Sequence, residues 1–189
     1  MANLYDLKPF VLPYAGGCPA AVVEQAIRLV MMDFAAKAEV WREIITASTA
    51  VDEDEYQLTP SANTKILRVQ SVEVDGTEVK SSSYYISQDD ILVFDAAHTA
   101  VGVNNISVLV VVSPTIANTT CPTWLYTRYF DTLRQGVLAN VKSMTGKPWA
   151  DPEGYQLSSE EYRKGWVRAR CDIQSARHSD TIRVTIPKI

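Results

Sequence analysis

The chain has little of several residue types on which catalytic, disulfide-rich and membrane proteins depend. Among its 189 residues are three cysteines and two histidines, and no cysteine pair has the short spacing of a disulfide framework or a zinc knuckle. The longest uninterrupted apolar run, Val108–Val112, is far shorter than a membrane-spanning helix. Asp6 interrupts the first apolar stretch and no basic segment precedes it, which argues against a secretory signal peptide. We therefore expect a soluble protein synthesised in a reducing compartment.

Motifs that bind phosphate or activate a nucleophile are also missing. No G-x-S-x-G elbow, G-x-G-x-x-G loop or Walker-type loop occurs. His98 and His178 have no ligand-spaced partner, and the acidic run Asp52–Glu55 lacks the glycine and alternate spacing of a calcium loop. Gly16 and Gly17 precede a helix start that could take an anion, although a plain chain reversal explains them equally well. We predict no catalytic residue, no metal site and no cofactor, and we expect that the protein is not an enzyme.

Charge is distributed unevenly along the chain. The formal net charge is −4, but residues 1–120 carry 7 Lys/Arg against 15 Asp/Glu, a net of −8, and residues 121–189 carry 11 against 7, a net of +4. Apolar residues make up 47% and charged residues 21% of the chain, which is ordinary for a globular protein of one domain or one domain with an insertion. The chain is therefore electrically polar along its sequence.

The first 18 residues are predicted to form an extended arm, because Pro9, Pro13 and the two following glycines disfavour a helix. The arm is too apolar to remain in water, so it packs either on its own core or on a neighbouring subunit. The candidates for a subunit–subunit contact are Leu7, Phe10, Leu12 and Tyr14. Apolar residues then recur at helical spacing and predict a helix over 19–40.

The middle of the chain is predicted to be a β-insert over 41–114, because short β-favouring segments alternate with turn signals. Asp75-Gly76 is typical of a two-residue hairpin. The nearly continuous apolar run Ile106–Val112 is typical of a strand buried on both faces. Together these segments indicate a small antiparallel sandwich or barrel.

A pair of helices is predicted over 121–178. Apolar residues of the first helix step by four or three positions from Leu125 to Met144. The second helix is predicted to begin at Ser158 or Ser159, with a capping box in the first case. Its apolar seam is suited to packing beside the first helix, and it consists of Tyr162, Trp166, Ala169, Ile173 and Ala176.

Residues 179–189 are predicted to form a C-terminal tail strand, because apolar and polar residues alternate there at the strand period. The apolar members are Ile182, Val184 and Ile186. A lone strand has unpaired backbone groups and must join its own sheet or that of another chain. The predicted fold class is α+β: a small helical bundle of three main helices with an inserted antiparallel β-module and extended terminal arms, all within one domain over 1–189.

The last predicted helix and the tail are rich in cations. The candidate binding residues among them are Arg168, Arg170, Arg177 and Arg183. A basic face of this kind is either a solvated helix surface, a contact for an acidic protein, or a set of phosphate contacts to nucleic acid. Trp166 lies on the apolar seam, so stacking on single strands is not indicated.

Several short segments occur in a fixed order along the chain. They are Phe34–Lys37, Trp41–Glu43, Tyr56–Leu58, Val72–Gly76, Pro114 and, within Pro122–Arg177, Gly136–Leu138, Pro148–Pro152, Tyr162–Trp166 and Ala169–Arg170. In this order they resemble bacteriophage head-to-tail adaptors, the tail accessory factors or connectors of short-tailed phages and their relatives. The resemblance covers most of the chain.

The resemblance implies a virion structural protein that forms a ring, expected to be a dodecamer, beneath the portal vertex. Such a ring joins the capsid portal to the tail and continues the DNA channel. The implied partners are the portal protein, tail tube or nozzle proteins, further copies of the chain, and genomic DNA that passes without specific recognition. The implied location is the neck or tail of the virion, after assembly in the host cytoplasm.

The resemblance also implies roles for particular segments. The C-terminal segment of relatives grips the portal, which assigns the cations above and the three apolar tail residues to portal or neighbour binding. The acidic residues 1–120 are expected to face the channel. The apolar first 17 residues depart from the pattern of the family, and we expect them instead to lock neighbouring subunits. The alternative is a nucleic-acid-binding module that uses the basic third helix.

Overall fold

The structure, a computed structural model, describes residues 1–87, 90–96 and 102–181, and at 104 and 176–181 it describes the backbone alone. The predicted tail-strand residues Ile182, Arg183, Val184 and Ile186 lie outside the described residues, as does His98. The tail strand therefore stays a prediction.

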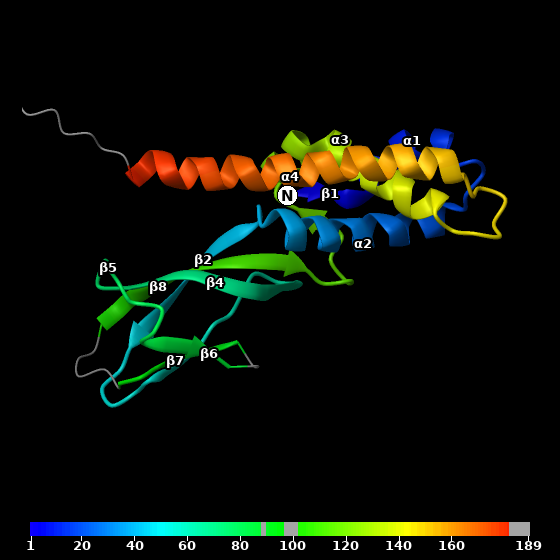
Figure 1. Cartoon of the computed structure of the whole chain (residues 1–189). Coiled ribbons are helices and arrows are strands. Elements are labelled where there is room, and N and C mark those ends of the chain that lie inside the picture. Colours follow the sequence, from blue (N-terminus) through cyan, green and yellow to red (C-terminus); the bar gives the residue numbers. More distant parts are fainter. Residues whose placement is uncertain (88–89, 97–101, 182–189) are drawn as a thin grey trace, which may run out of the picture. The chain divides into compact units, whose positions relative to one another are not determined.

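The chain divides into two compact units, each described by itself here. The helical unit comprises Met1–Val40 and Thr119–Ile189, and the β unit comprises Trp41–Asn118. The β unit is therefore an insertion between two parts of the helical unit (Figure 1).

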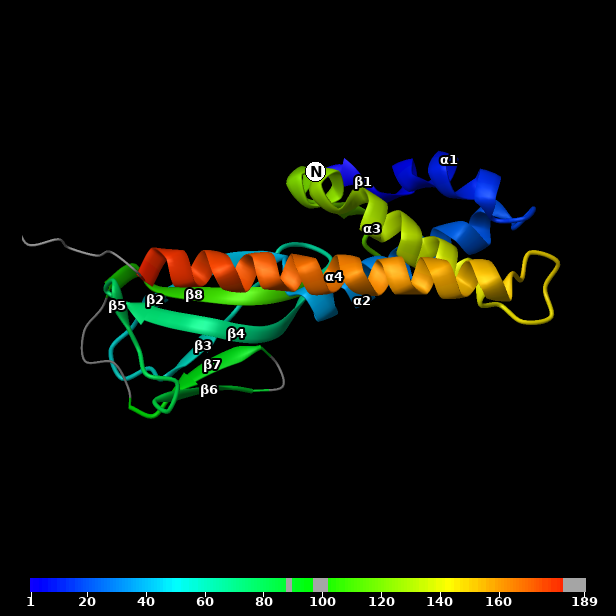
Figure 2. The same cartoon turned by 45° about the horizontal axis from the view of Figure 1, so that its top comes forward.

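The N-terminal segment of the helical unit is helical, so the predicted extended arm is wrong. The segment consists of β1 (Ala2–Asn3), the 3-10 helix η1 (Leu4–Leu7), α1 (Lys8–Val11) and the 3-10 helix η2 (Leu12–Tyr14). Pro9 and Pro13 occupy the first turns of α1 and η2, where a missing N–H breaks no hydrogen bond. The segment runs along α3 (Thr123–Lys142) and α2 (Ala20–Ala38) (Figure 2).

Helix α2 carries the apolar face that its spacing predicts. Its buried positions follow the helical period from Val23 to Ala38. The helix ends at Glu39, which adopts a left-handed conformation with φ of 55° and donates its N–H to Ala35 O at 3.1 Å. The Glu39 carboxylate meets another helix, as described below.

Helices α3 and α4 (Pro152–Thr181) pack side by side (Figure 1). The predicted stripe of α3 is confirmed from Leu125 to Val141, since Leu125, Leu133 and Val141 are fully buried. Its last predicted member, Met144, lies beyond the end of the helix. The predicted start of α4 at Ser158 or Ser159 is wrong, because the helix begins six residues earlier. Asp151 Oδ1 accepts the Gly154 N–H at 2.9 Å, so the Asp-Pro step supplies both the cap and the first helical residue.

The β unit contains two antiparallel sheets. The larger has the order β2-β8-β4-β5 and the smaller the order β3-β7-β6. The strands are β2 (Arg42–Thr49), β3 (Glu55–Gln57), β4 (Thr64–Val74), β5 (Thr77–Glu78), β6 (Tyr84–Ile86), β7 (Ile91–Phe94) and β8 (Gly102–Pro114). Both sheets contribute buried side chains to the core of the unit, among them Val72, Leu92 and Val108.

Two local predictions for the β unit are confirmed. Asp75 and Gly76 have positive φ and close the β4–β5 hairpin, which pairs Val74 with Thr77. Strand β8, which contains Ile106–Val112, lies between β2 and β4 and is buried along most of that run.

The predicted fold class is wrong in its architecture. The described residues form four α-helices and two 3-10 helices instead of three main helices, and their strands form three sheets instead of one module. The third sheet, β1 with β9 (Thr120–Cys121), belongs to the helical unit itself. The broad class α+β agrees with the structure. The additional helices arise because the N-terminal prolines stand in first helical turns, where proline starts a helix and does not break it.

Candidate interaction surface

The most distinctive surface of the helical unit is a cluster of aromatic side chains on α1 and α3. The rings of Phe10 and Phe130 meet edge to face with centroids 5.1 Å apart, and the Tyr126 ring lies 5.6 Å from that of Phe130. Phe10 remains 50% exposed, so half of this ring faces solvent. Large aromatic side chains that stay half-exposed are enriched where one protein binds another. We call Phe10, Tyr126 and Phe130 the aromatic cluster.

A cation–ring pair lies on the same two parts of the chain. The Arg134 guanidinium lies 5.5 Å from the centroid of the Tyr14 ring, and Tyr14 is 60% exposed. The buried Nε of Arg134 makes no hydrogen bond to the described part of the chain. Arginine stacked on tyrosine is a frequent component of protein interfaces, because both side chains combine apolar area with hydrogen-bonding groups.

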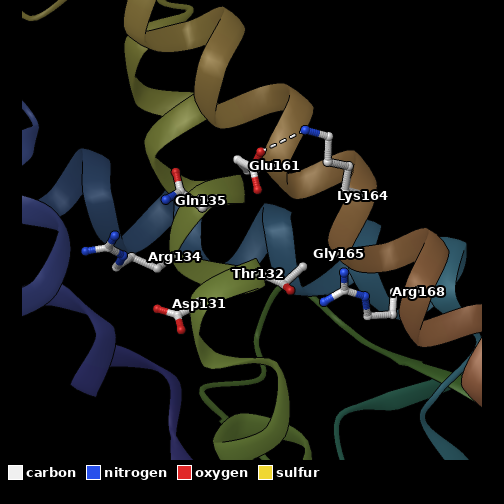
Figure 3. A pocket seen from close by; sticks show the side chains of 8 residues that line it. All are labelled: Asp131, Thr132, Arg134, Gln135, Glu161, Lys164, Gly165 and Arg168. Carbon is white, nitrogen blue, oxygen red and sulfur yellow. Dashed lines mark hydrogen bonds and ion pairs between the residues drawn. The ribbon is translucent and has the colours of Figure 1, made fainter.

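A polar hollow of about 350 Å³ lies between side chains of α3 and α4, and Arg134 is one of the residues that line it (Figure 3). Three cations and two carboxylates line it, together with polar and small residues. The lining residues are Asp131, Thr132, Arg134, Gln135, Glu161, Lys164, Gly165 and Arg168. A Cβ at Gly165 would lie 2.4 Å from Thr132 Oγ1, so the glycine allows the two helices to approach closely. Because charges of both signs are interleaved, the hollow suits a complementary protein surface better than one anionic ligand.

Two cations of α4, Lys164 and Arg170, pair with neighbouring carboxylates. Lys164 Nζ lies 3.0 Å from Glu161 Oε1 and 3.2 Å from Glu160 Oε1, and these hydrogen bonds raise the pKa of Lys164. Asp172 of α4 pairs with Arg128 of α3 at 3.2 Å. The surface of α4 therefore mixes charges of both signs and is not a uniform basic stripe.

The structure separates the arginines that the sequence grouped as binding residues. Arg168 lines the polar hollow. Arg170 instead donates to Glu39 Oε1 at 3.3 Å, and the Glu39 side chain is only 15% exposed, so this arginine joins α4 to the end of α2. Only the backbone of Arg177 is described, within α4. Arg168 and Arg170 therefore have different surroundings although they are two residues apart.

The four residues predicted for the arm also have different surroundings. Leu7 is buried within its own unit and Leu12 is half-buried, while Phe10 belongs to the aromatic cluster and Tyr14 to the cation–ring pair. Tyr126, Phe130 and Arg134 were not predicted as site residues, because they lie on the flank of the α3 stripe and not on the stripe itself. Their spacing of four residues was the available signal.

Burial strongly changes the pKa of Tyr162, and this residue has a structural role. Tyr162 Oη donates to Asp33 Oδ2 at 2.8 Å, and burial together with the Asp33 charge raises the pKa of Tyr162. Lys37 Nζ also binds Asp33, at 2.8 Å. A Cβ at Gly136 would lie 2.6 Å from the Val30 side chain and 2.8 Å from the Tyr162 ring. This contact fixes where α2, α3 and α4 meet.

The described residues bring together no group of three or more His, Cys, Asp or Glu side chains that could hold a metal ion. Cys18 and Cys121 are buried and Cys171 is exposed, all as free thiols. None of the described helices is long and apolar enough to span a membrane.

Comparison of the chain with known proteins identifies no relative: no protein-family model matches it, and no curated protein matches it significantly.

Proposed function

We propose that this chain is a structural subunit of a virion, which assembles into a ring between the capsid portal and the tail and continues the DNA channel. The observation that carries the proposal is the half-exposed aromatic cluster of α1 and α3, together with the cation–ring pair that joins Tyr14 to Arg134 of the same helix α3. Aromatic and arginine side chains dominate the energy of protein interfaces. The order of sequence segments that resembles head-to-tail adaptors supports the choice of a virion ring.

The charge of the β unit supports the channel part of the proposal. Trp41–Asn118 contains four Lys/Arg against eleven Asp/Glu, a net of −7, and the rest of the chain carries fourteen against eleven, a net of +3. A surface of net negative charge repels the phosphate backbone. A ring that exposes its β units to the channel would let DNA pass without holding it.

The charge pairing on α4 weighs against a nucleic-acid-binding module. Lys164 and Arg170 are engaged with carboxylates, and the polar hollow contains Asp131 and Glu161 beside its cations. Phosphate binding needs several uncompensated cations, because each neutralised phosphate releases counterions and adds to the affinity. We expect any binding to duplex DNA to be weak and to vanish with added salt.

The proposal is tested by mixing the purified chain with isolated portal rings of the same virion and measuring the mass of the mixture by light scattering. We expect a complex with several copies of the chain per portal ring. Replacing Phe10 and Phe130 by serine should weaken the complex at least about tenfold, as expected when interface aromatics are truncated. Leu157→Ser is the matched control, because Leu157 is 69% exposed and lies outside the aromatic cluster.

Absence of any complex between the wild-type chain and the portal rings would refute the proposal. Equal weakening by Leu157→Ser and by the aromatic double variant would show that the aromatic cluster is not the contact. Titration of fluorescent duplex DNA at low and high salt tests the alternative, which requires binding that persists near physiological ionic strength.

A further inference from the structure

A groove of about 350 Å³ lies among α2, α3 and α4, within the helical unit. Residues of all three helices line it, and Val30 of α2 and Gly136 and Ala139 of α3 are its buried apolar members. Glycine and alanine project little or no side chain from α3, so the space between the helices stays open there. We call this hollow the three-helix groove.

Two large side chains of the three-helix groove face solvent. Leu29 of α2 is 41% exposed and Tyr155 of α4 is 40% exposed, and both line the groove. An apolar side chain that entered between them would remove apolar area from water on both sides. Pockets of this kind are where the anchor residues of a protein partner insert, and such anchors are most often aromatic side chains or arginine.

The groove also presents a carboxylate. Asp33 lines it, and its side chain is 41% exposed. The Tyr162 hydroxyl and the Lys37 ammonium both donate to Asp33 Oδ2 at 2.8 Å, so neither bond uses Oδ1. Because a carboxylate accepts several hydrogen bonds, Asp33 can bind a further donor that enters the groove. The groove therefore suits an apolar ring that is accompanied by a cation.

The cation–ring pair of Tyr14 and Arg134 has this composition. Tyr14 is the most exposed aromatic side chain among the described residues of the helical unit, at 60%, and the Arg134 guanidinium lies against its ring. Arg134 and Gly136 are two residues apart on α3, a rotation of about 200° around the helix. The pair and the groove therefore lie on different sides of α3, and the Tyr14 ring stacked on Arg134 does not reach the groove of its own chain.

We propose that Tyr14 and Arg134 of one copy bind in the three-helix groove of a second copy. The ring packs between Leu29 and Tyr155, and the guanidinium donates to Asp33 Oδ1. Each copy carries the pair on one side and the groove on another, so the contact is heterologous and repeats from copy to copy, as a closed ring requires. The proposal rests on the proposed function only in needing neighbouring copies, and it leaves the aromatic cluster to the portal.

The test is photo-cross-linking of the full-length chain, both alone at high concentration and on portal rings. Tyr14→benzoylphenylalanine keeps an aromatic ring at the contact, and on irradiation this ring bonds to C–H groups beside it. We expect a covalent dimer on a denaturing gel, and we expect mass spectrometry to find the attachment at Leu29, at Tyr155 or beside them. Mixing isotope-labelled and unlabelled chains shows whether the two joined peptides come from different copies.

Trp124→benzoylphenylalanine is the matched control, because Trp124 is another half-exposed aromatic residue, at the start of α3. It should attach to the groove about tenfold less, since only chance encounters bring it there. Adding Leu29→Ser to the Tyr14 variant should lower the dimer yield about fivefold, as expected when an interface contact is truncated, and adding Leu157→Ser should leave it unchanged. If Leu29→Ser lowers the helical circular dichroism, Tyr155→Ser replaces it.

Attachment of the Tyr14 probe to the N-terminal segment of the other copy would mean a symmetric contact and would overturn the proposal. Attachment to the groove of the same chain, or equal dimer yields with Leu29→Ser and Leu157→Ser, would overturn it as well. Portal binding without attachment to the groove, in either preparation, would leave the proposed function standing and remove this inference. The cross-link without portal binding would do the reverse.

Discussion

The two units of the chain are held together by different interactions. In the helical unit, three long helices meet through side chains, with Gly136 admitting the Tyr162 ring and Phe34 packing 5.2 Å from the Tyr129 ring. In the β unit, the order comes from backbone ladders, with β8 paired on both sides by β2 and β4. The helical unit presents patches of side chains at its surface, among them the aromatic cluster.

The units also differ in charge, with a net of +3 for the helical unit and −7 for the β unit. The difference in charge lies at the surface, because the buried side chains of both units are almost all apolar.

The largest change in the free energy of unfolding is expected from Phe34→Ala, which removes a fully buried ring from the helical unit. Its loss should lower the free energy of unfolding by about 3–5 kcal/mol, measured by urea denaturation. Leu157→Ala, at an exposed position, should change it by less than about 0.5 kcal/mol. Amide exchange of β8 should stay unchanged if the units unfold separately. Loss of protection in β8 as well would show that they unfold as one.

Asn105→Ala tests the β unit in the same way. The Asn105 side chain accepts the Thr49 N–H and donates to Thr49 Oγ1, both at 3.0 Å, beside the irregularity of β2. Removing both bonds should cost about 1–3 kcal/mol and raise amide exchange in β2 but not in α3. Val103→Ala, at an 82% exposed side chain, is the control. Exchange that rises equally in α3 would contradict the separation of the units.

The local elements were predicted from the sequence far better than their assembly. The α3 stripe, the Asp75-Gly76 hairpin and the buried strand β8 follow from periodicities of 3.6 and 2 and from turn chemistry. The N-terminal segment was missed because proline has two opposite effects, breaking a helix inside it and starting one at its first turn. The start of α4 was missed for the same reason at Pro152.

The candidate surface was only partly predictable. Phe10 and Tyr14 were identified because apolar residues in a proline-rich segment need a covering surface. Their partners Phe130 and Arg134 could not be identified, since which flank of α3 meets the segment is decided by packing between elements distant in sequence. The ion pair of Arg170 with Glu39 could not be predicted either, because those residues are far apart along the chain.

A smaller change in the free energy of unfolding is expected from Tyr162→Phe than from the two variants above. The variant keeps the ring that packs on Gly136 but removes the hydrogen bond to Asp33, while Lys37 still neutralises the carboxylate. The free energy of unfolding should fall by about 1 kcal/mol. A loss as large as that of Phe34→Ala would mean that polar contacts, and not apolar packing, order the helical unit.

The smallest change in the free energy of unfolding at neutral pH is expected from Cys121→Ala. The difference between this variant and the wild type grows as the pH rises. Burial raises the pKa of the Cys121 thiol from 9.0 to about 12. Between these values the unfolded thiol is ionised while the folded thiol keeps its proton, so stability falls as pH rises from 9 towards 12. The variant should lose less stability over this range than the wild type, as measured by urea denaturation. Cys171→Ala, at an exposed thiol, should leave the slope unchanged.

The length of α4 has a mechanical consequence. The helix has 30 residues, and the pair of Asp172 with Arg128 joins it to α3 beyond Ala169, its last buried residue with a described side chain. The nine residues after Asp172, up to Thr181, extend about 14 Å at the rise of an α-helix. A tilt of about 5° at Asp172 therefore moves the tip of the helix by about 1.2 Å, roughly a quarter of the spacing between neighbouring strands. A small tilt of α4 where the helices meet thus produces a larger displacement of its C-terminal end.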